Sequence, residues 1–103
     1  MIEMNYSFNT KLSFENGLTI SFSIGGGNYC SNRINNPDDN PYENKTQTRK
    51  SENCEIAIWE TKTEKDMNIN LFLPEHLNTS DIVIGWVNAD DLAIIISNVA
   101  NYK

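Results

Sequence analysis

Three side chains of this sequence belong to types that often do covalent or metal chemistry: Cys30, Cys54 and His76, the only histidine. A structural zinc site needs four ligands, usually in close pairs, and that spacing is absent. A cysteine nucleophile needs a base within hydrogen-bond reach, whereas His76 lies in a Pro-Glu-His-Leu segment typical of a surface turn. We therefore expect no metal, no cofactor and no catalytic residue. A small thiol enzyme that uses Cys30 is the outside alternative.

Two further segments resemble ligand-binding motifs without meeting their requirements. Residues 25–28 read Gly-Gly-Gly-Asn, but a phosphate loop is followed directly by a helix, and here Tyr-Cys-Ser-Asn-Arg follows instead. Asp38, Asp39 and Glu43 supply carboxylates in an oxygen-rich stretch. They lack the alternating ligands, central glycine and distal glutamate of a calcium loop. A solvated loop is the favoured interpretation of this stretch.

The polar stretch of residues 28–53 is the segment that most suggests binding. It contains two prolines and few apolar side chains, and a connection of this length is usually functional or disordered. Its tyrosine and arginine side chains are of the types enriched at interface hot spots. An ordinary disordered loop is the competing interpretation. The candidate partner-binding residues are Tyr29, Arg33, Asp38, Asp39, Tyr42, Glu43 and Arg49.

Length and charge limit the class of protein. The chain has 103 residues and a formal net charge of −6, from 14 acidic and 8 basic residues. We expect one domain, residues 1–103, since this length supports a single core. The acidic excess disfavours nucleic-acid binding and can steer the protein to a basic patch on a partner. Without a signal peptide or an apolar run near the ~20 residues of a membrane helix, we expect a cytosolic protein with no membrane contact. Its two cysteines are then expected to be reduced, and a disulfide between them is the alternative.

The N-terminal half predicts a β-hairpin whose register follows from its hydrophobic pattern. Apolar and polar residues alternate from Tyr6 to Phe14 and again from Leu18 to Ile24. A two-residue turn would set each apolar row against polar neighbours, whereas a three-residue loop pairs Leu12 with Ile20. We therefore predict a three-residue loop, with Gly17 in the left-handed conformation.

The C-terminal half predicts further strands and one helix. Both tryptophans, Trp59 and Trp86, stand at the ends of expected strands, where packing on the sheet is the usual role. Asn88 suits a helix N-cap, and acidic residues follow it where the helix dipole favours negative charge. Leu92, Ile95, Ile96 and Val99 form an apolar stripe at helical spacing. The expected strands are Cys54–Trp59, Met67–Leu73 and Ile82–Val87, of which the last is either a strand or a buried approach to the helix.

This order of elements predicts an α+β fold. We expect an antiparallel sheet of about four to five strands with one C-terminal helix packed on a face. The long polar loop would lie between the second and third strands.

Several motifs carry a resemblance to known proteins. They are Asn-Gly at 16–17, Gly-Gly-Gly-Asn-Tyr-Cys-Ser-Asn-Arg at 25–33, Glu-Ile-Ala-Ile-Trp at 55–59 and Asp-Ile-Val-Ile-Gly-Trp at 81–86. The set resembles small bacteriophage- and prophage-encoded proteins of mostly unknown function, and among them prophage anti-defence inhibitors of SIR2-domain, NAD-depleting defence proteins. The resemblance implies occlusion of a large host defence protein by protein–protein contact, without enzymatic activity.

Two alternatives come from other classes. An acidic DNA mimic or anti-nuclease protein would use the negative charge, but Lys45, Arg49, Lys50, Lys62 and Lys65 interrupt the acidic residues. Strong salt sensitivity of partner binding would favour that alternative. A small virion or assembly component would instead assemble with itself.

The expected inhibitory role leads to a first prediction. Deletion of residues 33–50 is expected to abolish inhibition of the defence protein while the domain stays folded, because all the predicted contacts except Tyr29 lie there and the predicted core does not. Inhibition would be assayed as NAD loss, and folding by circular dichroism. Full inhibition by the deletion variant would contradict this mapping.

Overall fold

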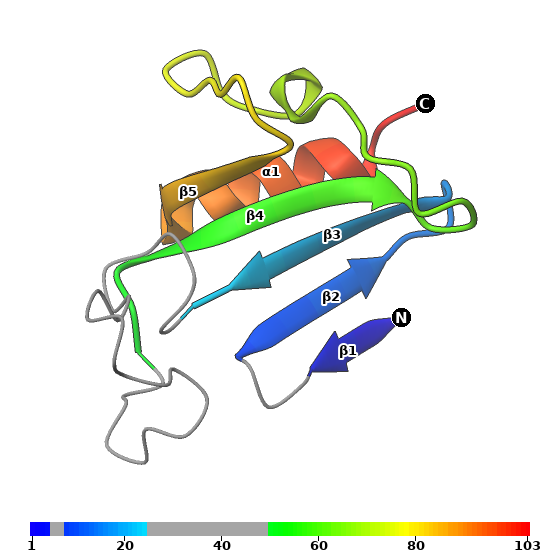
Figure 1. Cartoon of the computed structure of the whole chain (residues 1–103), viewed down its shortest axis with the longest axis horizontal. Coiled ribbons are helices and arrows are strands. Elements are labelled where there is room, and N and C mark those ends of the chain that lie inside the picture. Colours follow the sequence, from blue (N-terminus) through cyan, green and yellow to red (C-terminus); the bar gives the residue numbers. More distant parts are fainter. Residues whose placement is uncertain (5–7, 25–49) are drawn as a thin grey trace.

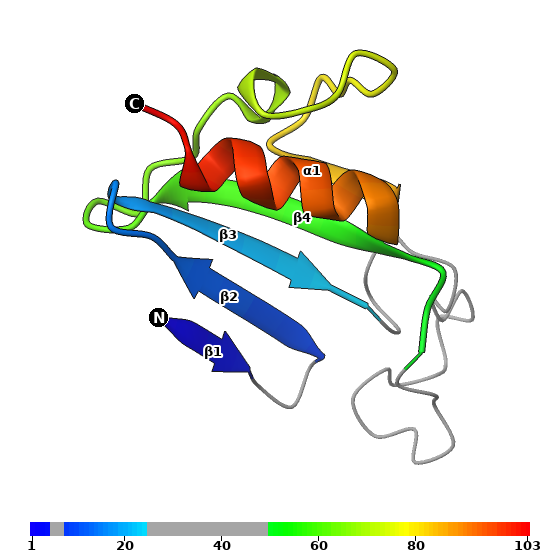
Figure 2. The same cartoon turned by 180° about the vertical axis from the view of Figure 1, so that it is seen from behind.

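The computed structural model describes residues 1–4, 8–24 and 50–103. The described residues form one antiparallel sheet of five strands in sequential order, with an α-helix across one face (Figures 1 and 2). This confirms the predicted α+β class. The elements are β1 (Ile2–Met4), β2 (Asn9–Ser13), β3 (Leu18–Ser23), β4 (Asn53–Glu60), the short 3-10 helix η1 (Ile69–Leu71), β5 (Val83–Asn88) and α1 (Ala89–Ala100).

Two parts of the prediction need comment. The sequence did not predict β1, which forms an edge of the sheet beside β2. The predicted polar loop falls between β3 and β4, and most of it lies outside the described residues. Within the described segments, no helix has the length and apolarity needed to cross a membrane.

The β2–β3 hairpin has the register that its hydrophobic pattern predicts. Leu12 lies opposite Ile20, and the amide of Phe14 donates to the carbonyl of Leu18 at 2.9 Å. The three-residue loop is therefore confirmed. Gly17 has a φ of +87°, and an added Cβ would meet no atom within 4 Å. The backbone conformation itself, rather than lack of space, is what favours glycine there.

Asn16 in this loop connects the hairpin to the far end of the chain. Its side-chain Nδ2 donates to the carbonyls of Val99 at 2.7 Å and Tyr102 at 3.1 Å. Its Oδ1 accepts from the amide of Leu18 at 3.2 Å. The last carbonyls of a helix have no partner within the helix. Asn16 therefore satisfies part of the C-terminus of α1 from a different element.

The helix begins as predicted. Asn88, the last residue of β5, is the N-cap, and its side chain accepts from the amide of Asp91 at 2.9 Å. Asp90 and Asp91 lie in the first turn, where the helix dipole favours negative charge. Strand and helix are thus joined without an intervening loop.

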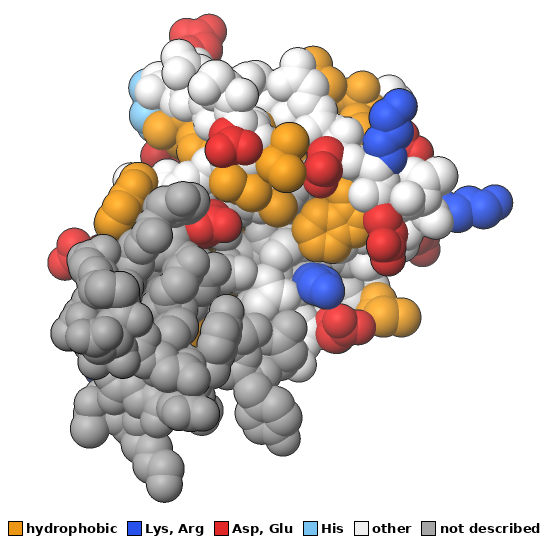
Figure 3. Space-filling view, viewed as in Figure 1, with side chains coloured by type: hydrophobic (Ala, Val, Ile, Leu, Met, Phe, Trp, Pro, Cys, Tyr) orange, Lys and Arg blue, Asp and Glu red, His pale blue; other side chains and the backbone are white. Residues whose placement is uncertain are grey.

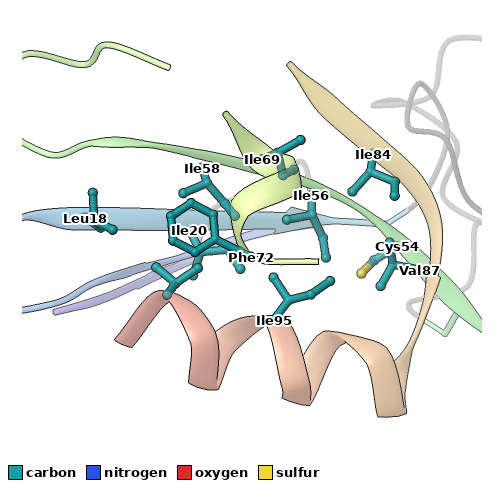
Figure 4. Close-up of a cluster of buried hydrophobic side chains, with 11 residues drawn as sticks. Leu18, Ile20, Cys54, Ile56, Ile58, Ile69, Phe72, Ile84, Val87 and Ile95 are labelled. Atoms are coloured by element: carbon teal, nitrogen blue, oxygen red, sulfur yellow. The ribbon is translucent and has the colours of Figure 1, made fainter. Parts of the chain in front are cut away.

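The core lies between α1 and the sheet (Figure 4). Ile95 and Val99 are fully buried, and Leu92 and Ile96 pack partly buried beside them, so the predicted apolar stripe is confirmed. The sheet contributes alternate residues of β3 and β4, as a sheet with one covered face requires. The buried apolar residues are Leu18, Ile20, Cys54, Ile56, Ile58, Ile69, Phe72, Ile84, Val87, Ile95 and Val99.

The predicted strand over Met67–Leu73 is wrong. The amide of Met67 donates to the carbonyl of Ile58 at 3.0 Å, but the chain then turns into η1. Asn68 caps this turn, since its side chain accepts from the amide of Asn70 at 3.2 Å. Short amide side chains that bond to the nearby backbone compete with a strand ladder. The segment consequently buries Ile69 and Phe72, three residues apart, and leaves Leu71 exposed.

The segment Ile82–Val87 had two interpretations, and the strand is the correct one. Residues Val83–Asn88 form β5, which pairs antiparallel with β4. The predicted strand Cys54–Trp59 is likewise confirmed as the central part of β4. The described part of the chain thus contains β1 and lacks the expected strand at Met67–Leu73.

Asn16 yields a second prediction. The Asn16→Ala variant is expected to lose about 1 kcal/mol of unfolding free energy, because the carbonyls of Val99 and Tyr102 lose the hydrogen bonds from its side chain. Urea denaturation would measure the loss. Glu15→Ala is the matched control, since this neighbouring exposed side chain should change stability by less than about 0.5 kcal/mol. Equal stability of both variants would show that the link to α1 contributes nothing.

Candidate protein-binding surface

The residues predicted to bind a partner, Tyr29, Arg33, Asp38, Asp39, Tyr42, Glu43 and Arg49, lie outside the described residues, as does Cys30. Their role stays a prediction. Of the other chemistry-bearing residues, Cys54 is buried in the core. His76 lies on the surface, as expected, with Nε2 3.0 Å from Oδ2 of Asp91. Among the described residues no group of three or more histidine, cysteine or acidic side chains is placed to hold a metal.

The sheet has one face away from α1 (Figure 1), and small polar residues of β2 and β3 lie on it. Because successive side chains of a strand point to opposite faces, the residues between the core positions of β3 lie on this face: Thr19, Ser21 and Ser23. Asn9 of β2 donates to the hydroxyls of Ser21 at 2.6 Å and Ser23 at 2.7 Å. The polar groups of neighbouring strands on this face thus bond to one another.

A second set of hydroxyls continues this network across the strands. The Oγ1 of Thr19 lies 2.9 Å from Oγ of Ser13 and 2.7 Å from Oγ1 of Thr61. Thr19 is buried although it carries a polar side chain, and these bonds satisfy it. We find no unpartnered buried side-chain nitrogen or oxygen among the described residues.

Trp59 packs on this face, in line with its predicted role. It lies opposite Thr19 on β3 and is partly buried. The Nζ of Lys11 stands 5.9 Å from its ring centroid, a distance at which a cation and an aromatic face attract one another. Trp59 therefore packs within the sheet.

Trp86 differs, because it lies in a β-bulge. Between the paired positions of β4 and β5, one residue of β4, Glu55, faces two residues of β5, Gly85 and Trp86. Such an extra residue disrupts the ladder locally and redirects a side chain. The pairs that flank the bulge are Cys54 with Val87 and Ile56 with Ile84.

The bulge holds Trp86 in an unfavourable backbone conformation and exposes it. Its φ is +61°, in the left-handed region that costs a bulky residue about 1–2 kcal/mol. Trp86 is 57% exposed, so more than half of the residue remains in contact with solvent. The prediction that Trp86 packs on the sheet is therefore wrong. Gly85 was the available signal, since glycine inside a strand often marks a bulge.

Two further exposed apolar side chains belong to the segment before β5 and to η1. Ile82 precedes β5, and Leu71 belongs to η1; both are exposed. The two segments are tied together by Asn70, whose side chain bonds to the backbone of Thr79 at 2.8 and 3.0 Å. Thr79 in turn donates to the carbonyl of Val83 at 3.1 Å. We call Trp86, Ile82 and Leu71 the β5 surface.

Acidic groups are interspersed with apolar side chains on the face that Figure 3 shows. Glu55 lies opposite the bulge, and Asp81 directly precedes Ile82. A surface with apolar anchors and negative neighbours suits a partner whose own surface is basic around an apolar recess.

A shallow recess lies at the opposite end of β4. It has a volume of about 430 Å³, between the hairpin loop and the C-terminal residues, and its ionisable lining side chains include Glu60, Lys62 and Lys103. Its described lining contains no cysteine, serine or histidine. Such a recess can accept a side chain of a partner.

The described residues therefore include an exposed tryptophan with a strained backbone on an edge strand. They also include a polar sheet face whose buried side-chain polar atoms all have hydrogen-bond partners. Comparisons with protein-family models, with curated proteins and with solved structures give no match for this chain.

Proposed function

We propose that this protein acts by binding another protein, and that the β5 surface takes part in the contact. The observation that carries the proposal is Trp86, which is 57% exposed and held at a φ of +61°. Strained backbone of this kind clusters at functional sites, where the surrounding structure holds it in place. The left-handed backbone conformation of Trp86 is itself a cost to the stability of the fold.

The chemistry of the side chain favours a protein partner. Tryptophan is among the residues most enriched at interface hot spots, because it brings a large rigid area and a single N–H donor. Ile82, four residues before Trp86, and Leu71 of η1 are also exposed and add apolar area that a partner can cover. β5 is also an edge strand of the sheet, so no further strand of the described fold lies beyond it.

The partner we propose is a large host defence protein of the SIR2-type, NAD-depleting class. The support is the resemblance of the chain to small phage and prophage proteins. The net charge of −6 adds to it, since an acidic inhibitor is steered toward basic surfaces. Occlusion of the defence protein would preserve cellular NAD without any reaction performed by this chain. The residues between 29 and 49 named above remain predicted contacts of the same partner.

The third prediction separates binding from folding at Trp86. Glycine tolerates the left-handed backbone, and this gain opposes the loss of the partly buried indole, so Trp86→Gly is expected to change the melting temperature little. The same variant is expected to lose about 2 kcal/mol of binding free energy, roughly 30-fold in Kd, through the lost aromatic anchor. Binding would be titrated against purified SIR2-domain defence proteins, with NAD hydrolysis followed in the same samples.

Two further variants make this measurement specific. Trp86→Asn also tolerates a positive φ and should bind as weakly as the glycine variant. Ile94→Ala removes an exposed apolar side chain from α1 and should bind like the original chain. If Trp86→Gly inhibits NAD hydrolysis with full potency, the β5 surface is not the contact. If the original chain binds no SIR2-domain protein, that partner class is wrong.

A further inference from the structure

The edge strand β1 has backbone groups that point away from the sheet. Met1 and Ser13 exchange two hydrogen bonds of 2.9 Å, from the amide of Ser13 and from the nitrogen of Met1. In an antiparallel pair, hydrogen-bonded and non-hydrogen-bonded pairs alternate. Glu3, opposite Lys11, is therefore the next residue bonded to β2. The N–H and C=O groups of Ile2 and Met4 point outward, where a further strand would pair.

The side chains of β1 continue the apolar row of the core beyond the helix. Ile2 lies opposite Leu12, and Leu12 lies opposite the buried Ile20, so all three share the face that α1 covers farther along. The helix packs on β3 and β5 and leaves β1 uncovered (Figure 2). Ile2 and Met4 are consequently 73% and 76% exposed.

We propose that β1 pairs antiparallel with β1 of a second copy of this chain, about a two-fold axis at Glu3. The sequence Ile-Glu-Met reads apolar, acidic, apolar in both directions, so the strand matches itself. Ile2 of each copy then lies opposite Met4 of the other. This register makes each such pair hydrogen-bonded, in agreement with the outward direction of these N–H and C=O groups. Two five-stranded sheets join into one continuous sheet.

The charges on the opposite face govern the strength of this pairing. The two-fold axis sets Glu3 against Glu3 of the second copy, and like charges directly opposed destabilise a pair of strands. Within each copy, Nζ of Lys11 lies 3.9 Å from the carboxylate of Glu3 and offsets part of that repulsion. Replacement of Glu3 by a neutral residue should therefore strengthen the dimer, and replacement by lysine should weaken it.

The self-complementary pattern of β1 favours a second copy of this chain over a segment of another protein. An extended peptide can pair with any edge strand through its backbone, but its side chains need not match β1. A C2 interface brings identical patches together, and β1 supplies both the donors and the apolar side chains that it needs. The dimer edge lies across the sheet from β5, so dimer formation and the proposed contact of Trp86 are independent.

The fourth prediction tests the dimer by sedimentation velocity across a concentration series. The full chain is expected to shift from 11.7 kDa to twice that mass as concentration rises. Ile2→Pro removes one outward N–H but no bond to β2, and Met4→Asp places a charge in the apolar pair. Each should raise the dimer Kd by roughly tenfold or more, and Glu3→Lys likewise, whereas Glu3→Gln should lower it.

Control variants keep this result interpretable. Ile94→Asp adds the same charge on the exposed side of α1 and should leave the dimer unchanged. Circular dichroism would verify that the β1 variants stay folded. A single 11.7-kDa species at every concentration, or a dimer that survives both Ile2→Pro and Met4→Asp, would overturn the proposal. Loss of the dimer in these variants with unchanged binding to the defence protein would support the dimer and leave the role of Trp86 intact.

Discussion

The register between β2 and β3 is the constraint on which the rest of the structure depends. Leu12 and Ile20 lie opposite one another, and Ile20 lies opposite Ile58, so one apolar row crosses three strands beneath α1. A slip of one residue would turn Ile20 to the polar face and leave α1 nothing to cover. The loop with Gly17 at positive φ sets this register, and the bonds from Asn16 to the end of α1 hold the helix above it.

The parts of the fold that the sequence predicts correctly are those with an uninterrupted period. Alternation over the hairpin and helical spacing in the last 15 or so residues each identify an element and the face it buries. The segment Met67–Leu73 alternates equally well, yet the side chain of Asn68 bonds to the local backbone and closes a helical turn. β1 was not predicted because Ile2–Met4 has only three residues, too few to show an alternating pattern.

The binding surface was harder to predict than the fold. In a regular strand, side chains are assigned to the two faces of the sheet by their alternation along the sequence. A bulge adds a residue and so shifts this alternation for the residues that follow. Trp86 follows Gly85 in the bulge, so its exposure could be found only by treating the glycine as an interruption. The partner residues predicted between Tyr29 and Arg49 rest on composition and resemblance, and hydrophobic periodicity has no bearing on them.

The link between Asn16 and Val99 also has a kinetic consequence. The two residues are 83 positions apart, whereas the pairings of β1 with β2 and of β2 with β3 join residues close in sequence. Contacts between distant residues cost more chain entropy to close, so local pairings form more readily in a folding transition state. The hydrogen bonds from Asn16 to the C-terminal residues should therefore form after the rate-limiting step of folding. These hydrogen bonds would therefore mainly lower the unfolding rate. Their strength would affect the lifetime of the folded chain more than its folding rate.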